Sequence, residues 1–296
     1  MVNVLIGNKN TAELDILCQN LANDKDYRIE NVTTGKDTVT MYLKTNPDIL
    51  VLDNSLSDMT IEDIVNRLSS NPVESKKCNT ILTLPKTYNI RMNKYAKINV
   101  NGYENIKKAN GAKLFVCNHL SNSDGIVLDK ILKKEYDPTF VAGVKLNDDP
   151  VTNLGIKIIK HISIKPNTAD KEAIIEMINI LKGGENLLLF PEGTRSRTGR
   201  LIEGKKGAIL VARMSKANII PISLTGTEKL LPINEKGNMS QEKWSDAIVN
   251  VNIGEPILMP KKNKKESKHE YDERCLNHLM QAIAQGLPEE YKGVYK

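Results

Sequence analysis

The stretch KLFVCNHLSNSDG at residues 113–125 decides how this chain folds. Its apolar start predicts a buried strand, the polar letters after it predict a turn, and a helix is expected to begin near Asp124. This strand, turn and helix place His119 and Asp124 in one concavity. A carboxylate on one imidazole nitrogen fixes the tautomer, so His119 is a candidate general base and Asp124 its orienting partner. The spacing alone also fits a loop histidine beside a helix-capping aspartate.

A second stretch, LLLFPEGTRSRTGR at residues 187–200, continues the pattern of a buried strand that runs into a polar loop. Gly193 allows a backbone turn, and three arginines follow it at 195, 197 and 200. An arginine presents a planar fork of N–H donors that matches phosphate oxygens. The loop is therefore predicted to bind an anion.

Strands and helices alternate outward from these two stretches, which predicts an α/β fold with a parallel sheet. Further strands are expected at 96–100, 139–142, 161–165, 219–224 and 248–253. Helices are expected at 123–134, 150–160, 169–182 and 205–217, and an amphipathic helix at 268–285.

The N-terminal part repeats this alternation and predicts a second, smaller α/β unit. Strands are expected at 2–6, 27–33, 47–53 and 79–84, and helices at 11–22, 35–45 and 60–69. Asp53 closes one of the strands, at the sheet edge where α/β proteins place their chemistry. The boundary is expected near Pro85, which gives a unit at 1–85 and a unit at 86–296.

Charge separates the same two parts. Residues 1–85 hold 8 basic and 12 acidic residues, a net −4, and residues 86–296 hold 34 and 24, a net +10. The basic part is expected to meet an anionic partner. Only 4% of the residues are aromatic, which disfavours stacking on nucleic-acid bases.

The sequence contains no recognisable segment that would direct the chain into a membrane or out of the cell. It has no apolar run near the ~20 residues of a membrane-spanning helix and no secretory leader. The four cysteines are far apart, which fits reduced thiols better than a disulfide framework or a metal site. A cytoplasmic protein without a metal is therefore expected.

The segment PDILVLDNSLSDMTIEDIVNRL at residues 47–68 resembles the central block of response-regulator receiver domains. The resemblance implies that Asp53 is a phosphoacceptor. Receivers hold Mg²⁺ with an acidic pair after the first strand, and Asn8 and Lys9 stand there in this chain. A fifth strand is also not recognisable. We therefore expect a degenerate, truncated receiver-like unit for docking or regulation, with a purely structural Asp53 as the alternative.

The second unit resembles the glycerolipid acyltransferases, in particular the lysophosphatidate acyltransferases. Three blocks carry the resemblance, in the family's order: NHLSNSD at 118–124, FPEGTRS at 190–196 and IIPISLTGT at 219–227. It covers about residues 90–258. It implies a glycerolipid acyltransferase-type α/β fold, His119 as the general base oriented by Asp124, and backbone N–H groups near the next helix as oxyanion donors. It also implies that the acceptor is positioned by Glu192, Gly193, Thr194 and Arg195.

The same resemblance implies the reaction and the partners. A lysophosphatidate hydroxyl attacks an acyl thioester of acyl-carrier protein or coenzyme A directly, and phosphatidate forms without a further cofactor. One block departs from the family, because Lys165 and Pro166 in ISIKP at 162–166 stand where an acidic residue and an arginine are usual, so that the arginine is absent. Lys165 is expected to act there as a point charge.

The protein is expected to attach peripherally to an anionic membrane on its cytoplasmic side, with help from the basic run KKNKKESKH at 261–269. One alternative function is an inactive lipid-sensing signalling protein that works through the receiver-like unit. The intact pair of His119 and Asp124 argues against this alternative. Another is an enzyme of the same family that acts on a different lysolipid or on a glycerol phosphate.

Overall fold

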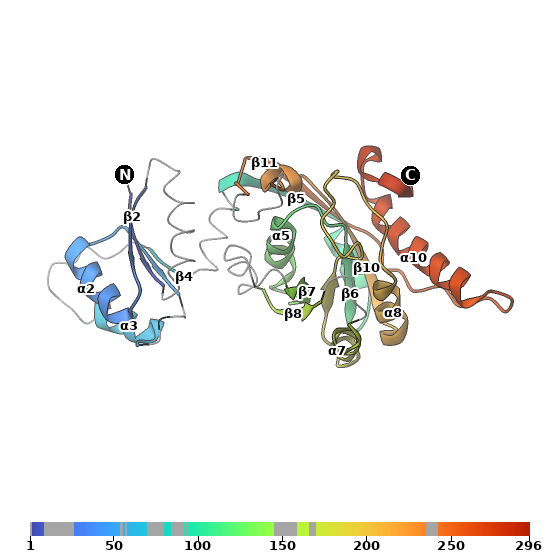
Figure 1. The fold of residues 1–296 in the computed structure, drawn as a ribbon, viewed down its shortest axis with the longest axis horizontal. Coiled ribbons are helices and arrows are strands. Elements are labelled where there is room, and N and C mark those ends of the chain that lie inside the picture. Colours follow the sequence, from blue (N-terminus) through green and yellow to red (C-terminus); the bar gives the residue numbers. More distant parts are fainter. Residues whose placement is uncertain are drawn as a thin grey trace. The chain divides into compact units, whose positions relative to one another are not determined.

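The fold was analysed in a computed structural model of the chain. It describes residues 2–8, 27–53, 56, 58–69, 80–83, 92, 94–144, 159–165, 170–234 and 242–296. The chain divides into two compact units, Met1–Arg91 and Met92–Lys296. The division thus lies after Arg91, a few residues beyond the expected position at Pro85, and each unit is described by itself below (Figure 1).

The N-terminal unit is a parallel sheet of four described strands in the order β2-β1-β3-β4. The strands are β1 (Val2–Gly7), β2 (Tyr27–Val32), β3 (Ile49–Leu52) and β4 (Thr80–Thr83), and the helices are α2 (Gly35–Thr45) and α3 (Ile61–Ser69). This is the order of the first four strands in flavodoxin-like folds. Leu5, Leu50 and Leu52 are fully buried in its core.

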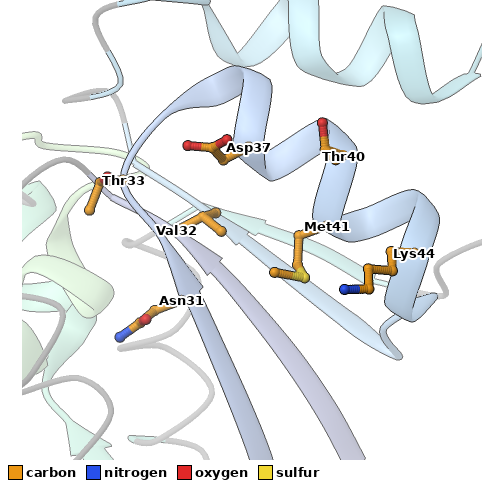
Figure 2. A pocket seen from close by; sticks show the side chains of 7 residues that line it. All are labelled: Asn31, Val32, Thr33, Asp37, Thr40, Met41 and Lys44. Atoms are coloured by element: carbon orange, nitrogen blue, oxygen red, sulfur yellow. The ribbon is translucent and has the colours of Figure 1, made fainter.

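Asp53 lies at the carboxyl edge of this sheet, where its N–H donates to the carbonyl of Gly7 at 3.0 Å. The neighbouring Asn8 is fully buried. A shallow pocket in this unit lies between β2 and α2, and Asn31, Thr33, Thr40 and Lys44 are among the side chains that line it (Figure 2). Asp53 is not one of them, and its role as a phosphoacceptor stays a prediction.

The C-terminal unit is built on a sheet of seven described strands in the order β5-β11-β10-β6-β9-β7-β8. These are β5 (Ala96–Asn101), β6 (Lys113–Cys117), β7 (Thr139–Gly143), β8 (His161–Ile164), β9 (Leu187–Leu189), β10 (Asn218–Thr225) and β11 (Ala247–Ile253). All neighbouring strands are parallel except β10 and β11. The reversal at β11 was not predicted, and it brings the segment before β11 to the carboxyl end of β10.

Alternating side chains divide the core of this unit into two layers. Leu114 and Val116 of β6 face a cluster with α7 (Lys171–Lys182), α8 (Lys206–Ser215) and α10 (Lys268–Gln285). Phe115 and Cys117 face the opposite cluster, which holds α5 (Ser123–Leu132) and the 3-10 helix η1 (Tyr103–Lys108). Helices therefore cover both faces of the sheet (Figure 1).

The α/β class and the predicted strands and helices that fall on described residues are confirmed to within a few residues at their ends. The amphipathic helix at 268–285 is α10, which begins with a capping box of Ser267 and Glu270. The helix expected at 11–22 lies outside the described residues, and so does the helix expected at 150–160 apart from its last two residues. In the described part of the chain, no helix combines the length and the apolar character needed to cross a membrane.

Candidate active site

Three loops meet at one edge of the large sheet because β10, β6 and β9 are parallel neighbours. The loop after β6 carries His119, the loop after β9 carries Glu192 to Ser196, and α9 (Thr227–Leu230) follows β10. The side-chain amide of Asn118 joins the loop after β6 to strand β10. It donates to the carbonyl of Leu224 at 2.8 Å and accepts from the N–H of Leu224 at 2.7 Å. The amide thus extends the pairing of β6 and β10 by one step.

His119 and Asp124 form the contact that their spacing predicted. His119 Nδ1 lies 2.7 Å from Asp124 Oδ2, and the same oxygen accepts the N–H groups of Leu120 at 2.6 Å and Ser121 at 2.9 Å. The Asp124 side chain is fully buried, whereas 20% of the His119 side chain is exposed. With Nδ1 held by the carboxylate, Nε2 is the nitrogen left to take a proton from a substrate.

The second sequence block holds His119 from three further directions. The His119 N–H donates to Glu192 Oε1 at 2.6 Å, and the His119 carbonyl accepts the N–H of Ser196 at 2.7 Å. The ring of Phe190 stacks on the imidazole, with ring centroids 4.1 Å apart and planes inclined by 16°. These contacts give a physical reason why the two blocks occur together. No role for Phe190 or Ser196 was predicted from the sequence.

Glu192 lies behind the site rather than in it. Its side chain is fully buried, and its second oxygen accepts the N–H of Ile202 at 2.9 Å. Both oxygens are therefore used on the backbone of the chain itself. Through these contacts Glu192 holds the backbone at His119 and at Ile202, and its part in positioning the acceptor stays a prediction.

The backbone donors at the start of α5 are mostly engaged. Leu120 and Ser121 donate to Asp124, Ser123 donates to the hydroxyl of Ser121, and Asp124 donates to the carbonyl of Ser121. An oxyanion donor near this helix was expected from the resemblance. These four N–H groups hold the loop itself in its conformation and are not free for that role.

The remaining loop residues differ in exposure. Gly193 has φ +68°, a left-handed conformation that favours glycine, and its N–H closes a turn to Phe190 at 3.0 Å. Gly193 and Thr194 are exposed, and Arg195 is partly buried. Arg195 Nη1 lies 2.6 Å from Glu242 Oε1, a partner that the sequence analysis did not find.

Lys165 lies at the same edge but toward its end. It follows β8, and β9 and β7 stand between β8 and β6. Three strand spacings correspond to roughly 14 Å. The Lys165 side chain is exposed, and its backbone N–H donates to Asp170 Oδ2 at 3.0 Å. A contact between Lys165 and the acceptor stays a prediction.

The described residues hold no cluster of three or more His, Cys, Asp or Glu side chains arranged to bind a metal ion. Cys117 and Cys275 are both buried as free thiols. Burial raises the pKa of the Cys117 thiol well above its ordinary value, and the nearby carboxylates of Asp124 and Glu192 act in the same direction. Cys117 is therefore a core residue beneath the site and not a nucleophile.

Burial also raises the pKa of Glu192 to about 7, against the opposing effect of its two backbone hydrogen bonds. An unfolded chain releases this proton near its ordinary pKa of 4.5, so between about 4.5 and 7 the folded state binds more protons. The free energy of unfolding should therefore fall as the pH rises through this window. Urea unfolding of the parent and of Glu192→Gln across pH 5 to 8 tests this expectation. The difference between their free energies of unfolding should change with pH. A difference that does not change with pH would contradict it.

Comparison with known proteins agrees with this geometry. Residues 97–225 match the sequence profile of the acyltransferase family. A chloroplastic 1-acyl-sn-glycerol-3-phosphate acyltransferase of Arabidopsis thaliana is 30% identical over 145 residues, which cover 48% of this chain and 40% of that protein. A probable 1-acyl-sn-glycerol-3-phosphate acyltransferase of Mycoplasma pneumoniae is 34% identical over 139 residues, 45% of this chain and 51% of that protein.

A solved structure is also similar. The crystal structure of the 1-acyl-sn-glycerophosphate acyltransferase of Thermotoga maritima aligns with 68% of this chain and 77% of its own, at 26% identity and a TM-score of 0.50. The matched regions span about two fifths to one half of the two curated relatives above. Residues 97–225, which hold most of the sheet and the loop site, are thus similar to the acyltransferase class of proteins. Within that class, the chain is similar to 1-acyl-sn-glycerol-3-phosphate acyltransferases.

Proposed function

We propose that this chain transfers a fatty acyl group from a thioester to the free hydroxyl of lysophosphatidate and so forms phosphatidate. One observation carries the proposal: His119 is held at Nδ1, at its backbone and by the ring of Phe190, while the partly buried Arg195 lies in the loop that contacts His119. A base and a phosphate-binding cation in adjoining loops suit an acceptor that carries both a hydroxyl and a phosphate.

The chemistry follows from this arrangement. His119 Nε2 takes the proton of the acceptor hydroxyl as its oxygen attacks the thioester carbonyl, and Asp124 stabilises the imidazolium that forms. Collapse of the tetrahedral intermediate breaks the carbon–sulfur bond, and the imidazolium returns the proton to the leaving thiolate. The acyl group passes directly from sulfur to oxygen, so no covalent enzyme intermediate forms.

The test is a panel of acceptors with the purified full chain. Lysophosphatidate, glycerol 3-phosphate, a lysophosphatidylcholine and a monoacylglycerol should each be offered with acyl-coenzyme A and with acyl-carrier protein. We expect turnover with lysophosphatidate to exceed that with the acceptor lacking phosphate by at least tenfold. Equal turnover of the monoacylglycerol would contradict the role of the phosphate, and turnover of none would contradict the function.

The receiver-like unit offers a second candidate role, in regulation. The observation in its favour is the strand order β2-β1-β3-β4 with Asp53 at the carboxyl edge. Receivers carry a metal-binding carboxylate at the position of the buried Asn8, and an asparagine side chain has no carboxylate. We infer a docking or regulatory module rather than a second catalytic unit.

We also propose that the protein meets its lipid acceptor at an anionic membrane surface through the loop between β11 and α10. Lys261, Lys262, Lys264 and Lys265 are all exposed in this loop. Leu258 near its start is 63% exposed. Each lysine near an anionic surface contributes ~1 kcal/mol of attraction, which salt screens.

Sedimentation with vesicles tests this surface. We expect binding to phosphatidylglycerol-rich vesicles at low salt, little binding to phosphatidylcholine and release when salt is raised several-fold. Replacing the four lysines with Gln should weaken binding at least tenfold. The matched control replaces four other exposed lysines with Gln, at positions 134, 171, 182 and 216. Equal loss in both variants, or binding that persists at high salt, would count against the loop.

A further inference from the structure

Glu242 is a buried carboxylate at the edge of the site with no role so far. Only 2% of its side chain is exposed. The residues that follow Glu242 are fixed in place. Trp244 packs against the core, and the N–H of Ser245 donates to the carbonyl of Leu230 at 2.9 Å. The antiparallel direction of β11 places this segment beside the loops that follow the parallel strands.

Each oxygen of Glu242 holds a different loop of the site. Oε1 accepts from Arg195 Nη1 at 2.6 Å, and Oε2 accepts from the side-chain amide of Asn122 at 2.8 Å. Asn122 belongs to the block that carries His119, and Arg195 belongs to the block that contacts it. Glu242 therefore joins the two functional loops from a third segment of the chain.

The ion pair leaves Arg195 able to bind a second anion. A guanidinium has five N–H donors, and among the described residues only Nη1 of Arg195 has a hydrogen-bond partner. The Arg195 side chain is 16% exposed, so part of it stays accessible. The planar guanidinium fixes the direction of its other N–H groups once Nη1 is held.

We propose that Glu242 is a positioning residue for acceptor recognition, which orients Arg195 so that its unused N–H groups face the acceptor phosphate. The inference rests on the proposed function and names the residue that sets the phosphate site. An incoming phosphate does not displace Glu242, because a buried carboxylate without its cation is strongly unfavourable. The pair therefore persists while the acceptor binds, and the phosphate takes the remaining N–H groups of Arg195.

The experiment compares Glu242→Ala with Glu242→Gln in the full chain. Glu242→Ala frees Arg195, so the KM for lysophosphatidate should rise at least tenfold while kcat and the thioester KM change less than threefold. In Glu242→Gln the amide oxygen still accepts from Arg195, and Asn122 can turn its own amide to accept the new N–H group. This variant should therefore keep its acceptor KM within about threefold of the parent. Glu255→Ala, which alters an exposed glutamate paired with Lys108, is the matched control.

A second readout does not depend on turnover. Arg195→Ala leaves the Glu242 carboxylate buried and unpaired, so its melting temperature should fall, and Arg195→Ala combined with Glu242→Ala should recover part of that loss. The acceptor KM of the double variant should be no higher than that of Arg195→Ala alone. An unchanged acceptor KM in Glu242→Ala, or additive effects in the double variant, would overturn the inference.

The failure of this inference can be told apart from failure of the proposed function. The parent is measured first, and a parent without turnover of any acceptor contradicts the function. The melting temperatures still decide whether Arg195 and Glu242 act as one unit. A parent that is active on lysophosphatidate while Glu242→Ala keeps its acceptor KM contradicts the inference alone.

Discussion

His119→Ala should lower kcat for lysophosphatidate by about 10² to 10⁴-fold, the usual effect of removing a general base. The structure supports a specific loss, because the His119 backbone is held by Glu192 and Ser196 and does not depend on the imidazole. The loop should therefore keep its place and the melting temperature should change little. Initial rates at saturating acceptor and thioester measure the effect.

His278→Ala is the matched control, because His278 is an exposed histidine on α10. This variant should keep the parent rate. A His119→Ala enzyme that turns over lysophosphatidate at a rate near that of the parent would falsify the proposed mechanism.

Asp124→Asn should lower kcat by a comparable factor of about 10² to 10⁴ while the loop keeps most of its geometry. The Asn oxygen can still accept the three N–H groups that now converge on Oδ2. What disappears is the negative charge that stabilises the imidazolium. The new N–H₂ group replaces Oδ1, a buried oxygen without a hydrogen-bond partner among the described residues, so stability should fall by about 1–3 kcal/mol.

Asp129→Asn provides the control for this variant. Asp129 is also a buried aspartate of α5, and its partner is Lys133 rather than His119. Burial raises the pKa of Asp129, so a neutral amide is well tolerated there. The two variants should differ strongly in kcat. Similar rates for both would remove Asp124 from the reaction.

The fold could be predicted from the sequence wherever the information is local. The strand at Lys113–Cys117 and the helix at Lys268–Gln285 follow from the spacing of apolar residues. The reversal of β11 could not be predicted in this way, because periodicity gives no direction or neighbour to a strand. The sequence predicts a sheet covered by helices, but it does not predict which helix packs on which face, since packing across the sheet sets the partners of each strand.

In the candidate site, too, local contacts could be predicted from the sequence and long-range contacts could not. The contact between His119 and Asp124 was predicted because they lie five positions apart in one turn. The Asp124 side chain closes this turn by accepting the N–H groups of Leu120 and Ser121. Anion binding by the loop that carries Arg195 was predicted from the type of this residue. Glu192 was predicted to help position the acceptor, which stays a prediction, but its burial could not be predicted from its place in the loop.

The α/β class, the two blocks of candidate chemistry and the pairing of His119 with Asp124 can be predicted from the order of the amino acids alone. Each of these depends on residues within one strand, one turn or one helix. Tertiary packing is what brings Glu192 and Ser196 to the His119 backbone, stacks Phe190 on the imidazole and pairs Glu242 with Arg195. Those contacts join segments that are far apart in the sequence, and they exist because parallel neighbouring strands bring their carboxyl ends to one edge.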